Sequence, residues 1–496
     1  MFKRVLIANR GEVANRIIST CLDLGIETVA IYSDEDRALN YLNRADYAYR
    51  VGKGGASTSY KNVDAIMAIA KMAQVDCIHP GYGFLSEDAE FARTCKAHRI
   101  EFIGSDEELL KNLSNKLHVR AVAKKNGIKV VSSSEGTISD VKTGMEAAKK
   151  IGFPVVIKPA CGTHAKGVRR IDDEAGFEKA FSATQIEAQI TFNDDTIVVE
   201  KALAGAKNIE VPVLRDKKGK VLCLPELDCS IQRRYLKIFA ETPAPTLDDR
   251  QRRYIKDSAS KLAELLDLHG LASFEFLVKD GEIYFLEVNP RLTVEHTVTE
   301  MVTRLDLVKQ QFLIAAGEPL ELQDKELKCS GVAIQCRIYA ENPETFEPQI
   351  GVVNDMFLPM GPNVRHELIA HSGWKIPIHY DHMLAKMSVW GNDRKSVINK
   401  ITHLLKDYFY SGITTSISLQ RQIFSTPEVI EGTYDIDFMR GNFVFKRPEL
   451  PESVKTAITT ATAIKVYKTE EEKRGEVTLI STPISSWRKE IGTGRL

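Results

Sequence analysis

The sequence predicts an α/β (α+β) protein built from several domains. Its 496 residues are enough for three or four domains, and 43% hydrophobic and 27% charged residues are ordinary for a globular enzyme. Continuous apolar strands alternate with helices over residues 1–112, which predicts a parallel sheet covered by helices. Two alternating apolar runs on either side of the turn 279–282 predict an antiparallel hairpin further along the chain.

The N-terminal region supplies the predicted parallel sheet. Residues 4–8 form an apolar strand, a turn and a helix from about Val13 follow, and residues 28–32 form the next strand. The turn lacks the glycine pattern of dinucleotide-binding folds, so dinucleotide binding is disfavoured. The glycine-bearing loop 81–87 is expected to open a helix at Ser86.

A smaller unit, expected over about 131–204, carries a lysine followed by a glycine-containing loop. Lys158 ends the apolar run 154–158, and Gly162 and Gly167 lie in the loop. An ammonium group and closely approaching loop amides suit the binding of phosphate. The alternative for Lys158 taken alone is an edge strand with ordinary charges.

Glu275 and Glu287 are the most informative residues of the chain. The predicted hairpin lets both carboxylates point to one face, with Asn289 close behind, and such oxygen ligands suit Mg²⁺ (or Mn²⁺) on a nucleotide triphosphate. Arg291 and Glu295 follow directly as a fixed cation and a candidate base. The alternative is an acidic hairpin with a solvated face, which would not require these two residues.

The last part of the chain begins with another strand and ends in a polar tail. The alternation in residues 331–338 sends Arg337 to one face and its neighbours to the other. The tail, 447–496, turns rich in Thr, Lys and Glu and carries no motif. It is expected to be a docking element or partly disordered.

Charge and hydropathy argue against several classes of partner. Lysine plus arginine equals aspartate plus glutamate at 67 each, so no net field favours nucleic acid or an anionic membrane. No apolar run is long enough to span a bilayer, and the first residues lack a signal-peptide core. The eight cysteines form no CxxC pair, which indicates reduced thiols. We expect a cytoplasmic protein without a nucleic-acid or membrane partner.

The motifs together resemble those of biotin carboxylases, the ATP-grasp component of biotin-dependent carboxylases. The resemblance covers about residues 2–446, in the family's order, at positions 4–12, 79–87, 228–234, 287–296, 361–362, 380–386 and 412–415. It implies a Rossmann-like N-terminal domain (1–112), an ATP-grasp domain (113–330) with a mobile lid (about 131–204), and a C-terminal domain (331–446). The tail (447–496) has no role in this comparison.

The resemblance implies ATP- and bicarbonate-dependent carboxylation of biotin. In that reaction bicarbonate attacks ATP to give carboxyphosphate and ADP, carboxyphosphate yields CO₂, and the released phosphate helps to deprotonate biotin N1. The Ala-Lys-Met runs at 70–72 and 385–387 lie outside a biotinyl-domain context, so biotin is expected on a separate protein. The implied partners are a biotin carboxyl carrier protein and a carboxyltransferase subunit, and the implied assembly is a homodimer.

The resemblance also implies roles for individual residues. The metal ligands are Glu275, Glu287 and Asn289, and bicarbonate is bound by Arg291, Val294, Glu295 and Lys237. The catalytic set is Glu295, Arg291, Arg337 and Lys237, with Arg337 facing the enolate-like biotin oxygen. The ATP-binding set is Lys116, Lys158, Gly162, Lys166, Gly167, Glu200, Lys201, Leu203 and Gln232. For Lys237 the alternative is a solvated basic stretch, and His296 is interpreted as a packed core histidine.

Several positions depart from the family's pattern. Thr163, His164 and Ala165 follow Gly162 where further glycines are usual, and a non-glycine residue at positive φ costs roughly 1–2 kcal/mol. The other altered positions are Asn208, Pro212, Tyr235, Leu236, Pro290, Thr293 and Thr297. Two alternatives therefore stay open: a biotin-independent ATP-grasp carboxylase or ligase with another acceptor, and a catalytically weakened regulatory paralogue. The complete charged set favours chemistry, since isolated buried charges are costly.

Overall fold

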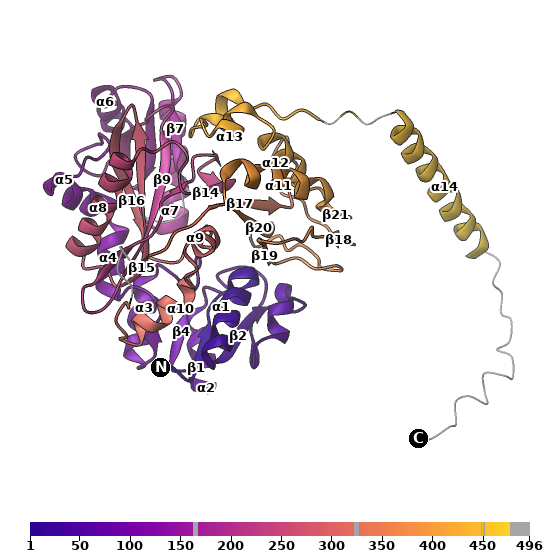
Figure 1. The fold of residues 1–496 in the computed structure, drawn as a ribbon, viewed down its shortest axis with the longest axis horizontal. Coiled ribbons are helices and arrows are strands. Elements are labelled where there is room, and N and C mark those ends of the chain that lie inside the picture. The colour runs from indigo at the N-terminus through magenta and orange to yellow at the C-terminus, as the bar shows by residue number, and fades with distance from the viewer. Residues whose placement is uncertain (162–166, 322–326, 448, 450–451, 477–496) are drawn as a thin grey trace. The chain divides into compact units, whose positions relative to one another are not determined.

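The computed structural model describes residues 1–161, 167–321, 327–447, 449 and 452–476. The chain divides into two compact units, Met1–Phe445 and Lys446–Leu496 (Figure 1). Five positions singled out in the glycine loop lie outside the described residues: Gly162, Thr163, His164, Ala165 and Lys166.

The N-terminal region contains a five-stranded parallel sheet in the order β3-β2-β1-β4-β5, which confirms the predicted parallel sheet. Its strands are β1 (Arg4–Ile7), β2 (Glu27–Ser33), β3 (Tyr47–Gly52), β4 (Cys77–His79) and β5 (Glu101–Phe102). The helices of this region are α1 (Gly11–Leu24), α2 (Val63–Met72), α3 (Ala89–Ala97) and α4 (Glu107–Ser114), with 3₁₀ turns η1 (Asp34–Asp36) and η2 (Asn40–Asn43).

One predicted helix start in this region was wrong and another was slightly late. The loop 81–87 does not open a helix at Ser86, because Asp88 accepts a hydrogen bond from the N–H of Phe91 and so caps α3 at Ala89. The first helix, α1, begins at Gly11 rather than at about Val13.

A three-stranded sheet in the order β7-β6-β8 forms a small subdomain with its own core. Its elements are β6 (Val155–Pro159), β7 (Arg169–Ile171), β8 (Ile197–Lys201), α6 (Val141–Ile151) and α7 (Phe177–Phe192). Alternate residues of a strand face opposite sides, so Ile157 enters this core while Lys158 points away from it.

The large sheet has nine strands, in the order β16-β15-β9-β11-β14-β17-β20-β19, with β10 paired to β9. Its strands are β9 (Lys207–Arg215), β10 (Val221–Cys223), β11 (Leu227–Asp228), β14 (Phe239–Thr242), β15 (Gly270–Lys279), β16 (Glu282–Asn289), β17 (Val332–Tyr339), β19 (Val364–Leu368) and β20 (Met383–Gly391). The antiparallel pairing of β14 with β17 joins the strands before residue 330 and those after it into one sheet.

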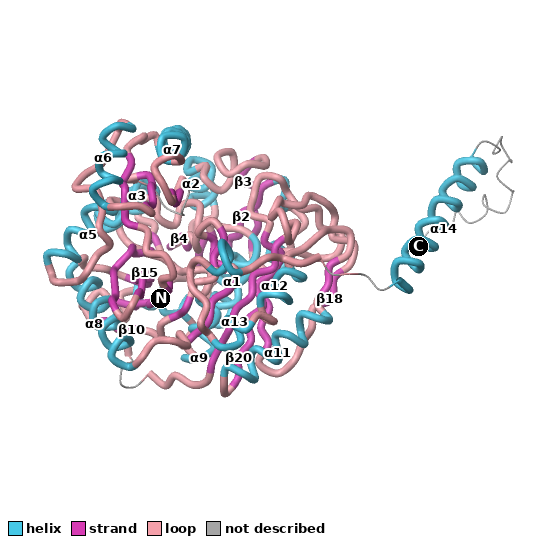
Figure 2. The backbone as a smooth tube through the Cα atoms, turned by 90° about the horizontal axis from the view of Figure 1, so that it is seen from above, coloured by secondary structure: helices cyan, strands magenta, loops and turns pink. Residues whose placement is uncertain are grey.

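Helices and two short strand pairs accompany the large sheet. Figure 2 shows α8 beside β10, which it contacts. The helices are α5 (Lys116–Lys125), α8 (Asp249–Leu265), α9 (His296–Thr303), α10 (Leu307–Ala315), α11 (Arg394–Asp407), α12 (Ile417–Ile423), α13 (Pro427–Glu431) and the π-helical turn η4 (Phe438–Asn442). The strand pairs are β12 (Gln232–Arg233) with β13 (Leu236–Lys237) and β18 (Met356–Phe357) with β21 (Phe409–Tyr410).

The second unit contains one long helix, α14 (Glu452–Glu476). Its apolar side chains Ile458, Ile464, Val466 and Tyr467 are all exposed. Among the helices of the described residues, none has the length and apolar character needed to cross a membrane.

Candidate active site

The strands β15 and β16 form the predicted hairpin, and their register places Glu275 opposite Glu287. Opposite residues of an antiparallel pair project to the same face, so both carboxylates point to one side of the sheet. The side-chain amide of Asn289 donates to Glu275 Oε1 at 3.1 Å. The predicted grouping of two carboxylates and one amide is therefore confirmed.

Lys237 lies at the centre of these acidic side chains. Its ammonium donates to Glu275 Oε1 at 3.0 Å, pairs closely with Glu210 on β9, and lies 3.9 Å from Glu295 Oε1. The hairpin of β12 and β13 carries it there, and the turn residues Arg234 and Tyr235 have φ values of 48° and 65°. Left-handed geometry at two central residues is typical of the tight turns that join such strands. The solvated-face alternative for Lys237 was wrong.

Glu295, at the start of α9, forms a buried ion pair with Arg337 on β17. Burial by itself favours the neutral acid, but Arg337, then Lys237 and the backbone N–H of Glu295, lower its pKa to about 2. Glu295 is therefore ionised at physiological pH. Burial instead raises the pKa of Glu210, with Lys237 opposing, so the two carboxylates beside Lys237 differ in proton affinity.

Arg291 is held between the hairpin and the loop 81–87. Its Nε donates to Glu87 Oε1 at 2.5 Å, and Nη2 donates to Asn289 Oδ1 at 3.3 Å. Burial disfavours its charge, but Glu87 more than compensates and raises the pKa of Arg291. The loop whose helix start was mispredicted thus contributes a carboxylate to the site.

A second cluster of charges lies where α5 meets the small sheet. Lys158 Nζ is 2.7 Å from Glu200 Oε2, and Arg120 pairs with the other oxygen of the same carboxylate. Lys116 lies 4.0 Å from Glu287, which links this cluster to the hairpin. Burial, then repulsion from Lys116 and Arg120, holds the pKa of Lys158 well below its usual value. An anion bound here would favour the charged form of Lys158.

Two cavities open on these clusters. One, of about 570 Å³, is lined by charged residues that include Glu87, Lys116, Arg120 and Glu287. The other, of about 640 Å³, has Lys237 and Arg337 in its wall together with Tyr339, Glu341 and Phe346. The charged side chains therefore line two pockets that are open to solvent.

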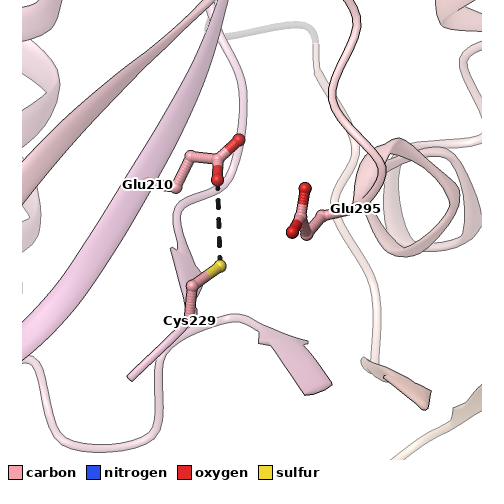
Figure 3. A group of neighbouring side chains, drawn as sticks. All are labelled: Glu210, Cys229 and Glu295. Carbon is pink, nitrogen blue, oxygen red and sulfur yellow. Dashed lines mark hydrogen bonds between the residues drawn. The ribbon is translucent and has the colours of Figure 1, made fainter. Parts of the chain in front are cut away.

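Glu210, Cys229 and Glu295 also lie within 4.8 Å of one another (Figure 3). Cys229 Sγ donates to Glu210 Oε2 at 3.8 Å, and burial raises the pKa of the thiol well above its usual value. Lys237 pairs with Glu210 and Arg337 pairs with Glu295, so each carboxylate already has a cation. A protonated thiol is also a poor ligand for a hard cation. We interpret this trio as part of the ion-pair cluster.

Three family models match the chain in succession. The biotin carboxylase N-terminal domain matches residues 1–110, the ATP-binding domain of the carbamoyl-phosphate synthase L chain matches 115–323, and the biotin carboxylase C-terminal domain matches 335–441. The biotin carboxylase of Allochromatium vinosum is 41% identical over 440 residues, 88% of this chain and 98% of that protein.

The chain belongs to the biotin carboxylase family. It is thus an ATP-dependent ligase of the biotin carboxylase type. The pyruvate carboxylase of Rhizobium etli, solved with acetyl coenzyme-A, is 33% identical, with a TM-score of 0.85 over 90% of this chain and 41% of that one. The biotin carboxylase domain dimer of Hydrogenobacter thermophilus 2-oxoglutarate carboxylase, solved with MgADP, ADP and bicarbonate, is 36% identical, with a TM-score of 0.87 over 90% of this chain and all of that one. The ATP-grasp fold expected from the resemblance is confirmed.

Two of the residues expected to bind ATP, Lys201 and Gln232, use their side chains for contacts with the backbone. On β8, Lys201 alternates with Glu200, and its ammonium donates to the carbonyls of Gly152 and Phe153 at 2.8 and 3.0 Å. The Gln232 side chain donates to a backbone carbonyl at 2.8 Å. Any contact of Lys201 with a nucleotide would therefore use its backbone.

Leu203, Gly167 and Val294 are held in place by their surroundings. Leu203 packs against a small apolar cluster. Gly167 has a φ of +74°, and a Cβ there would lie 2.9 Å from the ring of Pro159, so only glycine fits. Val294 offers its carbonyl to two buried donors.

The sequence reasoning missed two charged residues of the site, Arg120 and Glu210. It placed the loop that ends at Glu87 in the resemblance but gave Glu87 itself no role. Arg120 follows Lys116 by four residues on α5, so helical spacing places both on one face. Glu210 pairs in register with Glu275 across β9 and β15. Asn208, identified only as a departure, lies on the same face and donates to Glu275 Oε2 at 3.1 Å.

The described residues fit a divalent cation. Glu275 and Glu287 offer carboxylate oxygens on one face, and the Glu287 side chain is 35% exposed to the cleft. An oxygen-only set without a thiol or imidazole is what Mg²⁺ prefers, with water or phosphate completing the shell. Bound there, the ion would neutralise charge on a polyphosphate, while Lys116 lies beside it as a further cation.

Proposed function

We propose that this chain carboxylates biotin carried on a separate protein, using ATP, Mg²⁺ (or Mn²⁺) and bicarbonate. Bicarbonate oxygen attacks the γ-phosphorus of ATP, the bond to ADP breaks, and carboxyphosphate forms. Its breakdown gives CO₂ and phosphate, phosphate takes the biotin N1 proton, and N1 bonds to CO₂. The observation that carries the proposal is that the hairpin carboxylates lie among buried cations: Lys237 contacts Glu275, and Lys116 lies beside Glu287. Glu287, Lys116 and Arg120 line one pocket, and Lys237 and Arg337 line the other.

The nucleotide phosphates are assigned to the cluster around Glu200. The three basic side chains of Lys158, Lys116 and Arg120 outnumber the two carboxylates beside them, Glu200 and Glu287, which favours a polyanion. The metal is assigned to Glu275, Glu287 and Asn289. Gly162, Lys166 and Gly167 of the loop, with Lys201, Leu203 and Gln232, complete the proposed nucleotide site.

Bicarbonate is assigned to Arg291, Lys237 and the Val294 amide, with Glu295 as the base. Arg291 and Lys237 are buried cations within the same network, so they can bind an anion without prior reorganisation. Arg337 faces the second cavity and also pairs with Glu295. A guanidinium in that place suits the oxyanion that forms on the ureido group of biotin.

The domain limits proposed are 1–112, 113–330 with the lid at about 131–204, 331–446, and the tail 447–496. The proposed partners are a biotin carboxyl carrier protein and a carboxyltransferase subunit, and the proposed assembly is a homodimer. A cytoplasmic location is proposed on the basis of the eight free cysteines. The proposed final acceptor of the carboxyl group is an acyl-CoA or a 2-oxo acid such as pyruvate.

The test is ADP release by the purified full-length protein with Mg²⁺, measured with and without bicarbonate and free biotin. We expect bicarbonate-dependent release that free biotin stimulates. Turnover that requires bicarbonate but ignores biotin would support a biotin-independent carboxylase instead. Failure to bind ATP would support a regulatory paralogue.

A further inference from the structure

A buried ammonium group lies behind the site. The Lys386 side chain on β20 is 0% exposed, and its partner Glu12 on α1 is 2% exposed, with Nζ 3.1 Å from Oε2. Neither residue lines the two cavities described above. Removing an ammonium and a carboxylate from water costs several kcal/mol each. The attraction between the two groups in a single ion pair often does not offset this desolvation cost, so the pair by itself does not explain why both are buried.

Lys386 has a second contact that leads to the site. Its ammonium donates to the carbonyl of Val294 at 3.3 Å, and the side-chain amide of Gln335 on β17 donates to the same oxygen at 3.1 Å. In the register of β17 and β20, Arg337 is the partner of Lys386, so the two cations lie side by side on one sheet face. Arg337 binds the Glu295 carboxylate while Lys386 binds the carbonyl that precedes Glu295.

The geometry of the peptide bond connects these contacts. In a trans peptide the C=O and N–H groups point in opposite directions. With the Val294 carbonyl fixed toward the sheet, the N–H of Glu295 points away from it. That N–H favours the ionised form of the Glu295 carboxylate and so helps to lower its pKa. Rotation of this peptide would remove the N–H from the carboxylate.

We propose that Lys386 is a positioning residue for Glu295, acting through the Val294 carbonyl, and that the ion pair with Glu12 fixes the position of its ammonium group. The inference rests on the proposed role of Glu295 as the base. It extends the site to Glu12 on α1, a helix of the N-terminal region. It also explains why two adjacent strands, β17 and β20, supply donors to both the Val294 carbonyl and the Glu295 carboxylate.

The first test is the double substitution Glu12→Gln with Lys386→Met, which removes both charges at similar volume. Replacing a buried pair in this way often leaves stability unchanged, so the protein should fold. We expect the kcat for bicarbonate-dependent ADP release to fall about 10- to 100-fold, the cost of misplacing a catalytic group by about 1 Å. Affinity for ATP should change less than about twofold, since Lys158 and Lys116 are untouched.

The matched control is Glu241→Gln with Arg394→Met. This ion pair, 0% and 18% exposed, joins β14 to α11 and contacts no residue of the site. It should retain the wild-type kcat. Wild-type kcat in the Glu12/Lys386 variant, or an equal loss in both variants, would overturn the inference.

A second test uses Gln335→Met, which removes the other donor to the Val294 carbonyl and leaves the buried charges in place. It should lower kcat by itself, and combining it with the first double substitution should add little, because both act on one oxygen. Full additivity, or no effect of Gln335→Met, would contradict a shared action. This variant also carries the test if the Glu12/Lys386 variant does not fold. A wild-type protein without bicarbonate-dependent turnover would overturn the proposed function itself, before any variant is compared.

Discussion

Replacing Arg337 by methionine should separate biotin carboxylation from ATP cleavage. If the guanidinium stabilises the oxyanion of biotin, its loss should lower biotin-dependent turnover by about 10²–10³, equivalent to about 2.7–4 kcal/mol of transition-state stabilisation. Methionine keeps much of the volume, so the wall of the second cavity should remain packed. Carboxyphosphate formation takes place at Glu295, Arg291 and the metal, and should suffer less.

The contacts of Glu295 indicate how much Arg337→Met should lower stability and biotin-independent ATPase. Arg337 is the strongest ion-pair partner of Glu295, but Lys237 remains at 3.9 Å and Arg291 also favours the ionised carboxylate. Glu295 is therefore not left as an isolated buried charge. Breaking a buried pair costs about 3–5 kcal/mol when the remaining charge is unpaired, so we expect a stability loss of at most about 3 kcal/mol. Biotin-independent ATPase should fall no more than about tenfold.

The assay compares ADP release with and without free biotin at saturating ATP and bicarbonate, alongside thermal unfolding. Arg394→Met, which also removes a partly buried arginine from an ion pair, controls for general destabilisation. Equal loss of both activities would mean that Arg337 supports the fold or the nucleotide site. If neither activity changed, the main residue-level support for biotin chemistry would be gone.

Three further outcomes are expected. Glu287→Gln should abolish ATP turnover while leaving the fold intact, because it removes a charge from the metal site at constant volume; near-wild-type ADP release at saturating Mg²⁺ would contradict this. Burial raises the pKa of Glu341 to about 7, against about 4.3 when unfolded, so the folded state binds a proton that the unfolded chain releases between these values. The free energy of unfolding should then decrease as pH rises from about 4 to 7, by on the order of 1–3 kcal/mol, and urea titrations of Glu341→Gln should show a flatter pH profile. Glycine at Thr163, His164 and Ala165 should tighten ATP binding, measured by calorimetry, if these residues reflect drift; loss of activity would instead indicate an adapted loop.

Local patterns were sufficient for much of the fold. The alternation of apolar strands and helices predicted the parallel N-terminal sheet, and the turn between residues 279 and 282 predicted the hairpin and its shared acidic face. Both depend on short-range periodicity, which the sequence records directly. The predicted helix start at Ser86 was wrong because Asp88 caps the helix instead. Ser and Asp are both favoured at this position, so the sequence alone does not decide which of the two begins the helix.

The sequence by itself determined the family, the α/β class and the residue types of the site. Motif spacing and the two-residue period of strands can be read directly from the order of the residues. Only the tertiary structure decided which charges meet. It brought Arg120 to Glu200 and Glu87 to Arg291, and it joined Glu12 to the Glu295 segment through Lys386. Such pairs are separated by tens to hundreds of residues and arise from sheet register and helix packing. An unpaired charge in the buried interior is costly, so each ionised group pairs with an opposite charge that the fold brings close, however distant in sequence.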